Sequence, residues 1–168
     1  MLRHKISVVI AFIALVSALP NAASAQQKTL KERAIGAWSY VSSTAKAPDG
    51  SPFWGQNPNG LFILTEDGHF SWQVFRSDRP KFASNNRLNA TADELKANNQ
   101  GSLAYFGTYS VDEVSKTITF TTEASTYPNN EGEVLKRIIT KLTPDEFVYA
   151  NPANTLGQAV EATWKRLN

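Results

Sequence analysis

The chain has 168 residues, with 17 Lys and Arg against 15 Asp and Glu, two histidines and no cysteine. Arg3 and Lys5 precede residue 26 and no acidic residue does, so the remainder carries 15 charges of each sign. It therefore lacks the positive surface that nucleic acids and anionic membranes select. Without cysteine, and with only His69 after residue 25, disulfides, thiolate metal sites and multi-histidine metal sites are excluded. We expect no metal ion and no cofactor.

Residues 1–25 have the organisation of a secretory signal peptide. A positive start at Arg3 and Lys5 precedes an apolar run over residues 8–19, and Ala23 and Ala25 supply the small residues that a signal peptidase accepts. The apolar run is shorter than the roughly 20 residues that span a bilayer. We therefore expect export to a periplasm or to the medium, with no membrane insertion after cleavage. Residues 26–34 form a lead-in, and residues 35–168 form one domain.

The remaining chain is punctuated by turn residues between short β-branched and aromatic runs, which is typical of an all-β domain. Asp67 and Gly68 mark a hairpin. One helix is expected over residues 91–99, where Thr91 and Glu94 fit a capping box. Eight strands are predicted over residues 35–43, 61–65, 69–76, 103–111, 116–123, 133–142, 147–150 and 158–167.

Eight antiparallel strands with short hairpins favour a closed up-and-down barrel that leaves room for one small ligand. Aromatic residues occupy both faces of one predicted strand, with Tyr105 and Tyr109 on one side and Phe106 on the other. A two-sheet sandwich or a helix-covered sheet remains an alternative. We predict an eight-stranded antiparallel barrel with one short helix.

Several motifs together resemble the bacterial and fungal family of lipocalin-like domains, over residues 35–166. Gly36-Ala37-Trp38 resembles the Gly-x-Trp signature of lipocalins. Trp164 with Lys165-Arg166, in the last strand, resembles the segment whose basic residue packs over this tryptophan. The other matching segments are residues 55–60, 65–68, 76–80 and 103–112. The resemblance implies a barrel with a small-molecule cavity, and most members have no assigned reaction. Where members often carry two adjacent histidines, this chain has Phe120 and Thr121.

A small apolar or amphipathic molecule in the barrel interior is therefore the expected partner. Aromatic side chains with a polar atom can both cover and orient a ligand, while charged strand residues can hold a polar group or one another. Arg76 is alternatively the partner of Asp78 in a structural ion pair. The predicted ligand-binding residues are Trp54, Trp72, Arg76, Tyr105, Tyr109, Glu123 and Arg137.

The alternative hypothesis is a cofactor-free isomerase, cyclase or hydratase acting on a hydrophobic metabolite. Its acid, base or electrostatic groups would come from His69, Tyr109, Glu123 and Arg137, and at least two of these would have to converge in one cavity. No Gly-x-Ser-x-Gly elbow accompanies His69. We assign no catalytic residue, and binding is favoured over catalysis. An adaptor protein would instead show a packed barrel with an exposed apolar patch.

Overall fold

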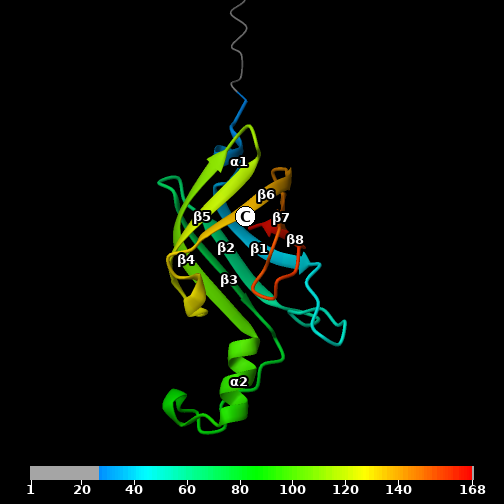
Figure 1. The fold of residues 1–168 in the computed structure, drawn as a ribbon, viewed down its shortest axis with the longest axis vertical. Helices are drawn as coiled ribbons and strands as arrows, with labels where there is room; N and C mark the ends of the chain where they lie inside the picture. Colours follow the sequence, from blue (N-terminus) through cyan, green and yellow to red (C-terminus); the bar gives the residue numbers. More distant parts are fainter. Residues whose placement is uncertain (1–26, 168) are drawn as a thin grey trace, which may run out of the picture.

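The computed structural model describes residues 27–167, and the predicted signal peptide lies outside them. Eight antiparallel strands close into a barrel in which each strand pairs with its neighbours in sequence and β1 pairs with β8 (Figure 1). This confirms the predicted up-and-down barrel. The strands are β1 Gly36–Ser43, β2 Asn59–Leu64, β3 His69–Phe75, β4 Ser102–Asp112, β5 Thr117–Ser125, β6 Val134–Leu142, β7 Glu146–Asn151 and β8 Val160–Arg166.

Within the described residues, two α-helices lie at opposite ends of the barrel (Figure 1). The predicted helix is α2, Ala92–Gln100, and the expected capping box is present, with the Thr91 side chain accepting from the backbone N–H of Glu94. The additional α1, Leu30–Ala34, is a single turn within the predicted lead-in. Its five residues give little periodicity to detect, so helical patterning could not reveal it.

The barrel interior is filled with aromatic rings from the α1 end to its middle. Alternation along each strand turns every second side chain inward. Phe62 stacks on Phe147 with centroids 5.8 Å apart, and Trp164 lies 5.4 Å from Phe62. Fully buried rings at the centre are those of Trp38, Phe62, Phe147 and Trp164. Because this half of the barrel interior is filled, a ligand inside the barrel must lie near the other end.

The α1 end of the barrel is sealed by hydrogen bonds between distant segments. The Glu113 carboxylate, in the β4–β5 turn, accepts from the backbone N–H groups of Leu30 and Lys31 at 2.7 and 3.0 Å. A carboxylate at this position satisfies the free N–H groups that begin a helix. The Trp38 indole N–H donates to the carbonyl of Ala34 at 2.8 Å, which joins the end of α1 to the core.

Arg166 closes the same end, as the lipocalin resemblance implies. Its guanidinium lies 3.9 Å above the centre of the Trp38 ring. It also donates to the carbonyls of Ile35 and Arg33 at 2.8 and 2.6 Å, and to the carbonyl of Pro144. One side chain therefore ties α1, the β6–β7 turn and the signature tryptophan together.

A β-bulge lies between β4 and β5, where the pairing shifts between Phe106 and Gly107. Gly107 pairs with Thr122 and Phe106 with Ala124, so that Glu123 is the extra residue. A bulge bends its strand and redirects side chains. The bulge is in β5, so β4 keeps its alternation, and Tyr105 and Tyr109 both face inward. They lie toward different ends of the barrel because they are four residues apart along the strand.

Candidate functional site

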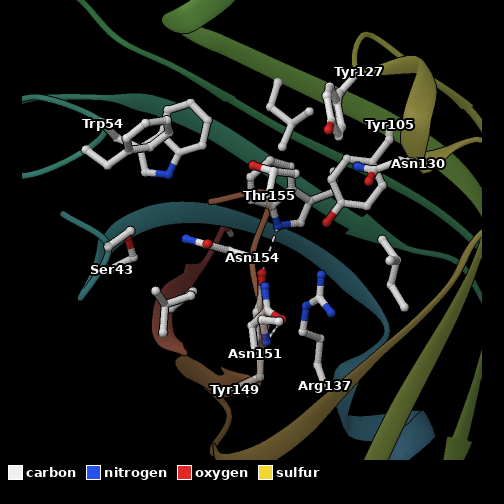
Figure 2. A pocket seen from close by; sticks show the side chains of 18 of the residues that line it. Ser43, Trp54, Tyr105, Tyr127, Asn130, Arg137, Tyr149, Asn151, Asn154 and Thr155 are labelled. Atoms are coloured by element: carbon white, nitrogen blue, oxygen red, sulfur yellow. Dashed lines mark hydrogen bonds between the residues drawn. The ribbon is translucent and has the colours of Figure 1, made fainter. Parts of the chain in front are cut away.

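The barrel contains a cavity of about 350 Å³ at the end opposite α1. This size lies within the range of small-molecule sites, roughly 300–1,000 Å³. Its walls come from the ends of strands and from the loops over residues 44–58, 126–133 and 152–159 (Figure 2). Its aromatic residues are Tyr40, Phe53, Trp54, Trp72, Tyr105, Tyr127 and Tyr149. The amide residues are Asn129, Asn130, Asn151 and Asn154, and the charged residues are Glu133 and Arg137.

Trp72 and Tyr149 form the floor of the cavity. The Trp72 indole N–H donates to the Tyr149 hydroxyl at 2.8 Å, and this bond is buried. The Trp72 ring also lies 5.0 Å from that of Tyr105 and 5.7 Å from that of Trp164, in the filled half of the barrel. Because the indole N–H and the hydroxyl bond to each other, neither polar atom is buried without a hydrogen-bond partner, and both rings can face the cavity.

Burial keeps Tyr40, Tyr105 and Tyr149 in their neutral form. Desolvation raises the pKa of Tyr105 and of Tyr149 well above the ordinary value, and the positive charge of Arg137 only partly opposes this. Desolvation likewise raises the pKa of Tyr40 to about 12. At neutral pH these hydroxyls therefore act as hydrogen-bond donors and acceptors and carry no charge.

Arg137 is the buried charge of the cavity wall, with 7 % of its surface exposed. Figure 2 shows its guanidinium and the Tyr105 hydroxyl pointing toward one another. The Nη1 group donates to the backbone carbonyl of Lys136 at 2.8 Å. Among residues 27–167, no carboxylate lies within 4.0 Å of the guanidinium to form an ion pair. Glu133 lines the same cavity at its exposed rim.

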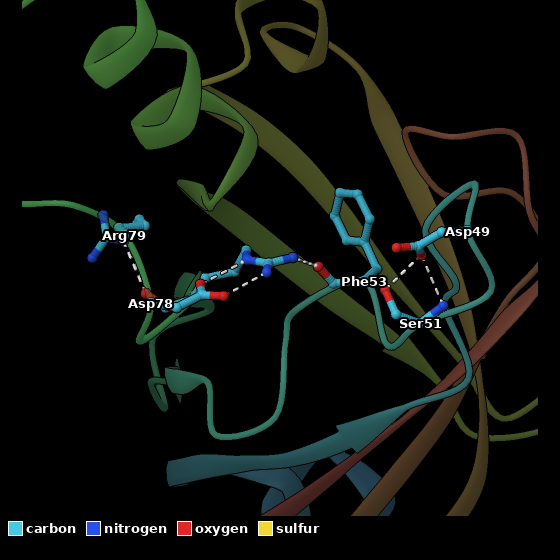
Figure 3. A network of polar contacts seen from close by, with 6 residues as sticks. Asp49, Ser51, Phe53, Asp78 and Arg79 are labelled. Atoms are coloured by element: carbon cyan, nitrogen blue, oxygen red, sulfur yellow. Dashed lines mark hydrogen bonds and ion pairs between the residues drawn. The ribbon is translucent and has the colours of Figure 1, made fainter.

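Phe53 and Trp54 form a lid on the cavity, from the loop between β1 and β2. Trp54 is buried, with its ring 6.3 Å from Trp72 and 4.9 Å from Phe53. Arg76 fixes this loop by donating to the carbonyl of Phe53 at 3.1 Å. Its other nitrogens donate to the Asp78 carboxylate at 2.9 and 2.6 Å. Figure 3 shows Phe53 within a network of polar contacts that also includes Asp49 and Ser51 of the same loop, and Asp78. Arg76 is therefore the support of the lid.

A second, more exposed hollow of about 630 Å³ lies on the other side of the lid, against the end of α2. It shares Phe53, Trp54 and Leu103 with the walls of the barrel cavity. Arg76 and Asp78 line this outer hollow and not the barrel cavity. The lid thus separates a buried chamber from an outer groove.

Four of the seven predicted ligand-binding residues meet in the barrel cavity: Trp54, Trp72, Tyr105 and Arg137. Trp72 and Tyr105 were identifiable because aromatic residues with a polar atom alternate inward along strands. Tyr149 and Tyr40, which also line the cavity, are absent from the predicted set. Tyr149 follows the inward Phe147 by two residues, and Tyr40 follows the inward Trp38 by two residues. This two-residue repeat of a strand was the signal that could have identified them.

The other three predicted ligand-binding residues do not line the barrel cavity: Arg76, Tyr109 and Glu123. Arg76 is held outside the cavity by its neighbour Asp78. Tyr109 lies toward the α1 end, where its hydroxyl donates to the carbonyl of Thr65 at 2.7 Å. Glu123 is exposed, since the inward alternation of Ile118, Phe120 and Thr122 directs it outward. Glu123 therefore neither lines the cavity nor forms an ion pair with Arg137.

The convergence that the enzyme hypothesis requires is not found. Of its four candidates, Arg137 alone lines the cavity. His69 is exposed at the start of β3, with Nδ1 3.2 Å from a carboxylate oxygen of Asp67. Desolvation raises the pKa of Tyr109 to about 12, and its hydroxyl is already engaged. These groups cannot act on one bound substrate.

Within residues 27–167, no group of three or more His, Asp or Glu side chains is arranged to hold a metal ion. The same part of the chain contains no helix long and apolar enough to cross a membrane.

The chain is similar to two solved structures and matches one family model. The crystal structure of a lipocalin-like protein from Bacteroides uniformis is similar, with a TM-score of 0.45 and 12 % identity, covering 80 % of this chain and 99 % of that chain. A redesigned β-barrel matches with a TM-score of 0.42 and 13 % identity, covering 82 % and 95 %. Comparison with curated proteins gives no match. The model of the lipocalin-like domain matches residues 35–167, and the chain therefore belongs to that family.

Proposed function

We propose that this protein binds a small apolar or amphipathic molecule in the cavity at the barrel mouth. The observation that carries the proposal is a chamber of about 350 Å³ in a barrel that is otherwise densely packed. A wall of aromatic rings with a few polar groups is typical of sites that take ligands by burying apolar surface and orient them by hydrogen bonds. Trp54 and Trp72 place two fluorophores directly on the wall.

The test is saturable binding of the neutral dye Nile red to the protein comprising residues 26–168, followed by dye emission and tryptophan quenching. Ala162 is buried on the cavity wall, so Ala162→Leu should fill part of the chamber and weaken dye binding at least about tenfold. Thr163→Leu, on the outer face of β8, is the matched control and should bind as the wild type does. Absence of saturable binding to the wild type would refute the proposal.

The positions of the candidate acid and base groups favour binding over catalysis. Arg137 is the only one of the four candidate groups on the cavity wall, and its guanidinium offers several hydrogen-bond donors to a bound molecule. We therefore assign no catalytic residue.

We further propose that the protein is exported and functions in a periplasm or outside the cell, because residues 1–25 have the three parts of a signal peptide. When the full chain is expressed in a bacterial host, we expect the protein released from the periplasm to begin at Gln26 by intact mass. Ala25→Arg should leave an uncleaved precursor, because the signal peptidase requires a small residue there. Wild-type protein of full-length mass retained in the cytoplasm would contradict the proposal.

A further inference from the structure

Arg137 is a buried cation without a charged partner in the part of the chain that the structure describes. A guanidinium carries five N–H donors, and burial of an uncompensated charge is costly. The tyrosines nearby cannot neutralise it, since burial keeps Tyr105 and Tyr149 protonated. Glu133 is the other charged residue of the wall and lies at the rim, beyond ion-pair distance. The counter-charge is thus missing from the described chain.

The order of residues along β6 places this cation deep in the chamber. From the rim inward, exposed Glu133 is followed by half-buried Leu135, buried Arg137 and then Ile139 in the core. Tyr105 and Tyr149, which are also buried, line the same chamber, and Phe53, Trp54 and Leu103 form an apolar part of its wall. The chamber therefore has a positive charge at its base, an apolar wall on the side of the lid, and a polar rim that includes Glu133.

We propose that the ligand is an amphipathic acid that enters with its carboxylate first, so that the carboxylate pairs with Arg137 and the apolar part lies against the lid. This inference rests on the proposed function and assigns the chemical class of its ligand. A planar guanidinium matches a carboxylate with two parallel hydrogen bonds. One positive charge balances one carboxylate, whereas a dianionic phosphate would remain under-neutralised. The Tyr105 and Tyr149 hydroxyls can donate to the oxygens that Arg137 leaves free.

The experiment compares two displacers of bound Nile red that share one tail, decanoate and decanol, at pH 8. Decanol is the more apolar, so a site that only buries surface prefers it. We expect decanoate to displace the dye at a concentration about 10- to 100-fold lower, the range expected for hydrogen bonds to a charged group. This comparison uses the wild type and does not depend on the folding of any variant.

Variants test whether Arg137 causes the preference for decanoate over decanol. Arg137→Gln should abolish this preference, and Arg137→Lys should retain part of it. Lys136→Gln, which removes a charge from the exposed face of the same strand, should leave it unchanged. Glu133→Gln should strengthen decanoate binding, because it removes a repelling charge from the rim. The carboxyl pKa of bound [1-¹³C]decanoate, followed by NMR, should be lower in the wild type than in Arg137→Gln.

The outcomes separate this inference from the proposed function. If Nile red binds but decanoate has no advantage over decanol, or if Arg137→Gln retains that advantage, the acid-binding inference is wrong and the chamber is a site for neutral ligands. If neither Nile red nor either decyl compound binds saturably, the proposed function fails and the inference fails with it.

Discussion

Gly107→Ala is expected to destabilise the barrel by about 3 kcal/mol or more, beyond the usual range for a single added methyl group. A Cβ atom at this position would lie 2.0 Å from the backbone oxygen of Thr121 and 2.9 Å from the backbone nitrogen of Glu123. Both neighbours belong to the backbone of β5, so no side-chain rotation can relieve the contact. The methyl group can fit only if β4 and β5 separate at the bulge.

The measurement is the free energy of unfolding in urea, with Gly132→Ala as the matched control. Gly132 has a φ of +78°, and no atom lies within 4 Å of its would-be Cβ. The control therefore reports backbone strain alone, of about 1–2 kcal/mol. Equal losses in the two variants would show that the approach of β4 and β5 at Gly107 is not structurally required. Gly107→Ala should also weaken Nile red binding, since Tyr105 is two residues away on the cavity wall.

Arg166→Met is expected to cost about 2–4 kcal/mol of stability. The substitution keeps an apolar stem over Trp38 but removes the cation and the hydrogen bonds to three backbone carbonyls. Each bond from a charged donor contributes about 1.5–3 kcal/mol at most, and the losses are not additive. Two of these carbonyls belong to Arg33 and Ile35, so α1 should be released from the barrel.

Urea unfolding again gives the stability, and hydrogen exchange at the backbone amides of Leu30 and Lys31 reports release of α1. Lys165→Met, exposed and adjacent, is the control and should fall within about 0.5 kcal/mol of the wild type. Because Arg166 lies at the end opposite the cavity, Nile red affinity below the unfolding transition should change little. If Arg166→Met is as stable as the wild type, Arg166 does not stabilise the closed end of the barrel.

The barrel was predictable from the sequence because its information is periodic and local. Hairpin turns such as Asp67-Gly68, and inward residues such as Trp72 and Tyr105, follow from the two-residue repeat of a strand. The capping box at Thr91 predicted the start of α2 in the same way. The contact of a basic residue with Trp38 spans most of the chain, and only the family resemblance predicted it, for Lys165-Arg166; the structure shows that Arg166 makes it.

The residues that line the cavity were harder to predict, because their positions depend on contacts between segments that are distant in the sequence. Arg76 directly follows β3 and Arg137 lies within β6. Asp78, two positions on, forms an ion pair with Arg76, whereas no carboxylate among residues 27–167 forms one with Arg137. Inward or outward orientation of Glu123 depends on strand register, which reverses with a shift of one residue. Tyr109 faces inward as predicted, but the filled aromatic core separates it from the mouth.

The two ends of the described chain lie together at the sealed end of the barrel, since α1 covers that end and β8 finishes there (Figure 1). The backbone N–H of Leu167 still bonds to the carbonyl of Ala37 at 2.8 Å, so the chain leaves the fold from this end. A tether attached at either terminus consequently points away from the cavity. The protein can be immobilised or fused through its termini while the ligand entrance stays open to solvent, which allows ligand exchange to be timed on a surface.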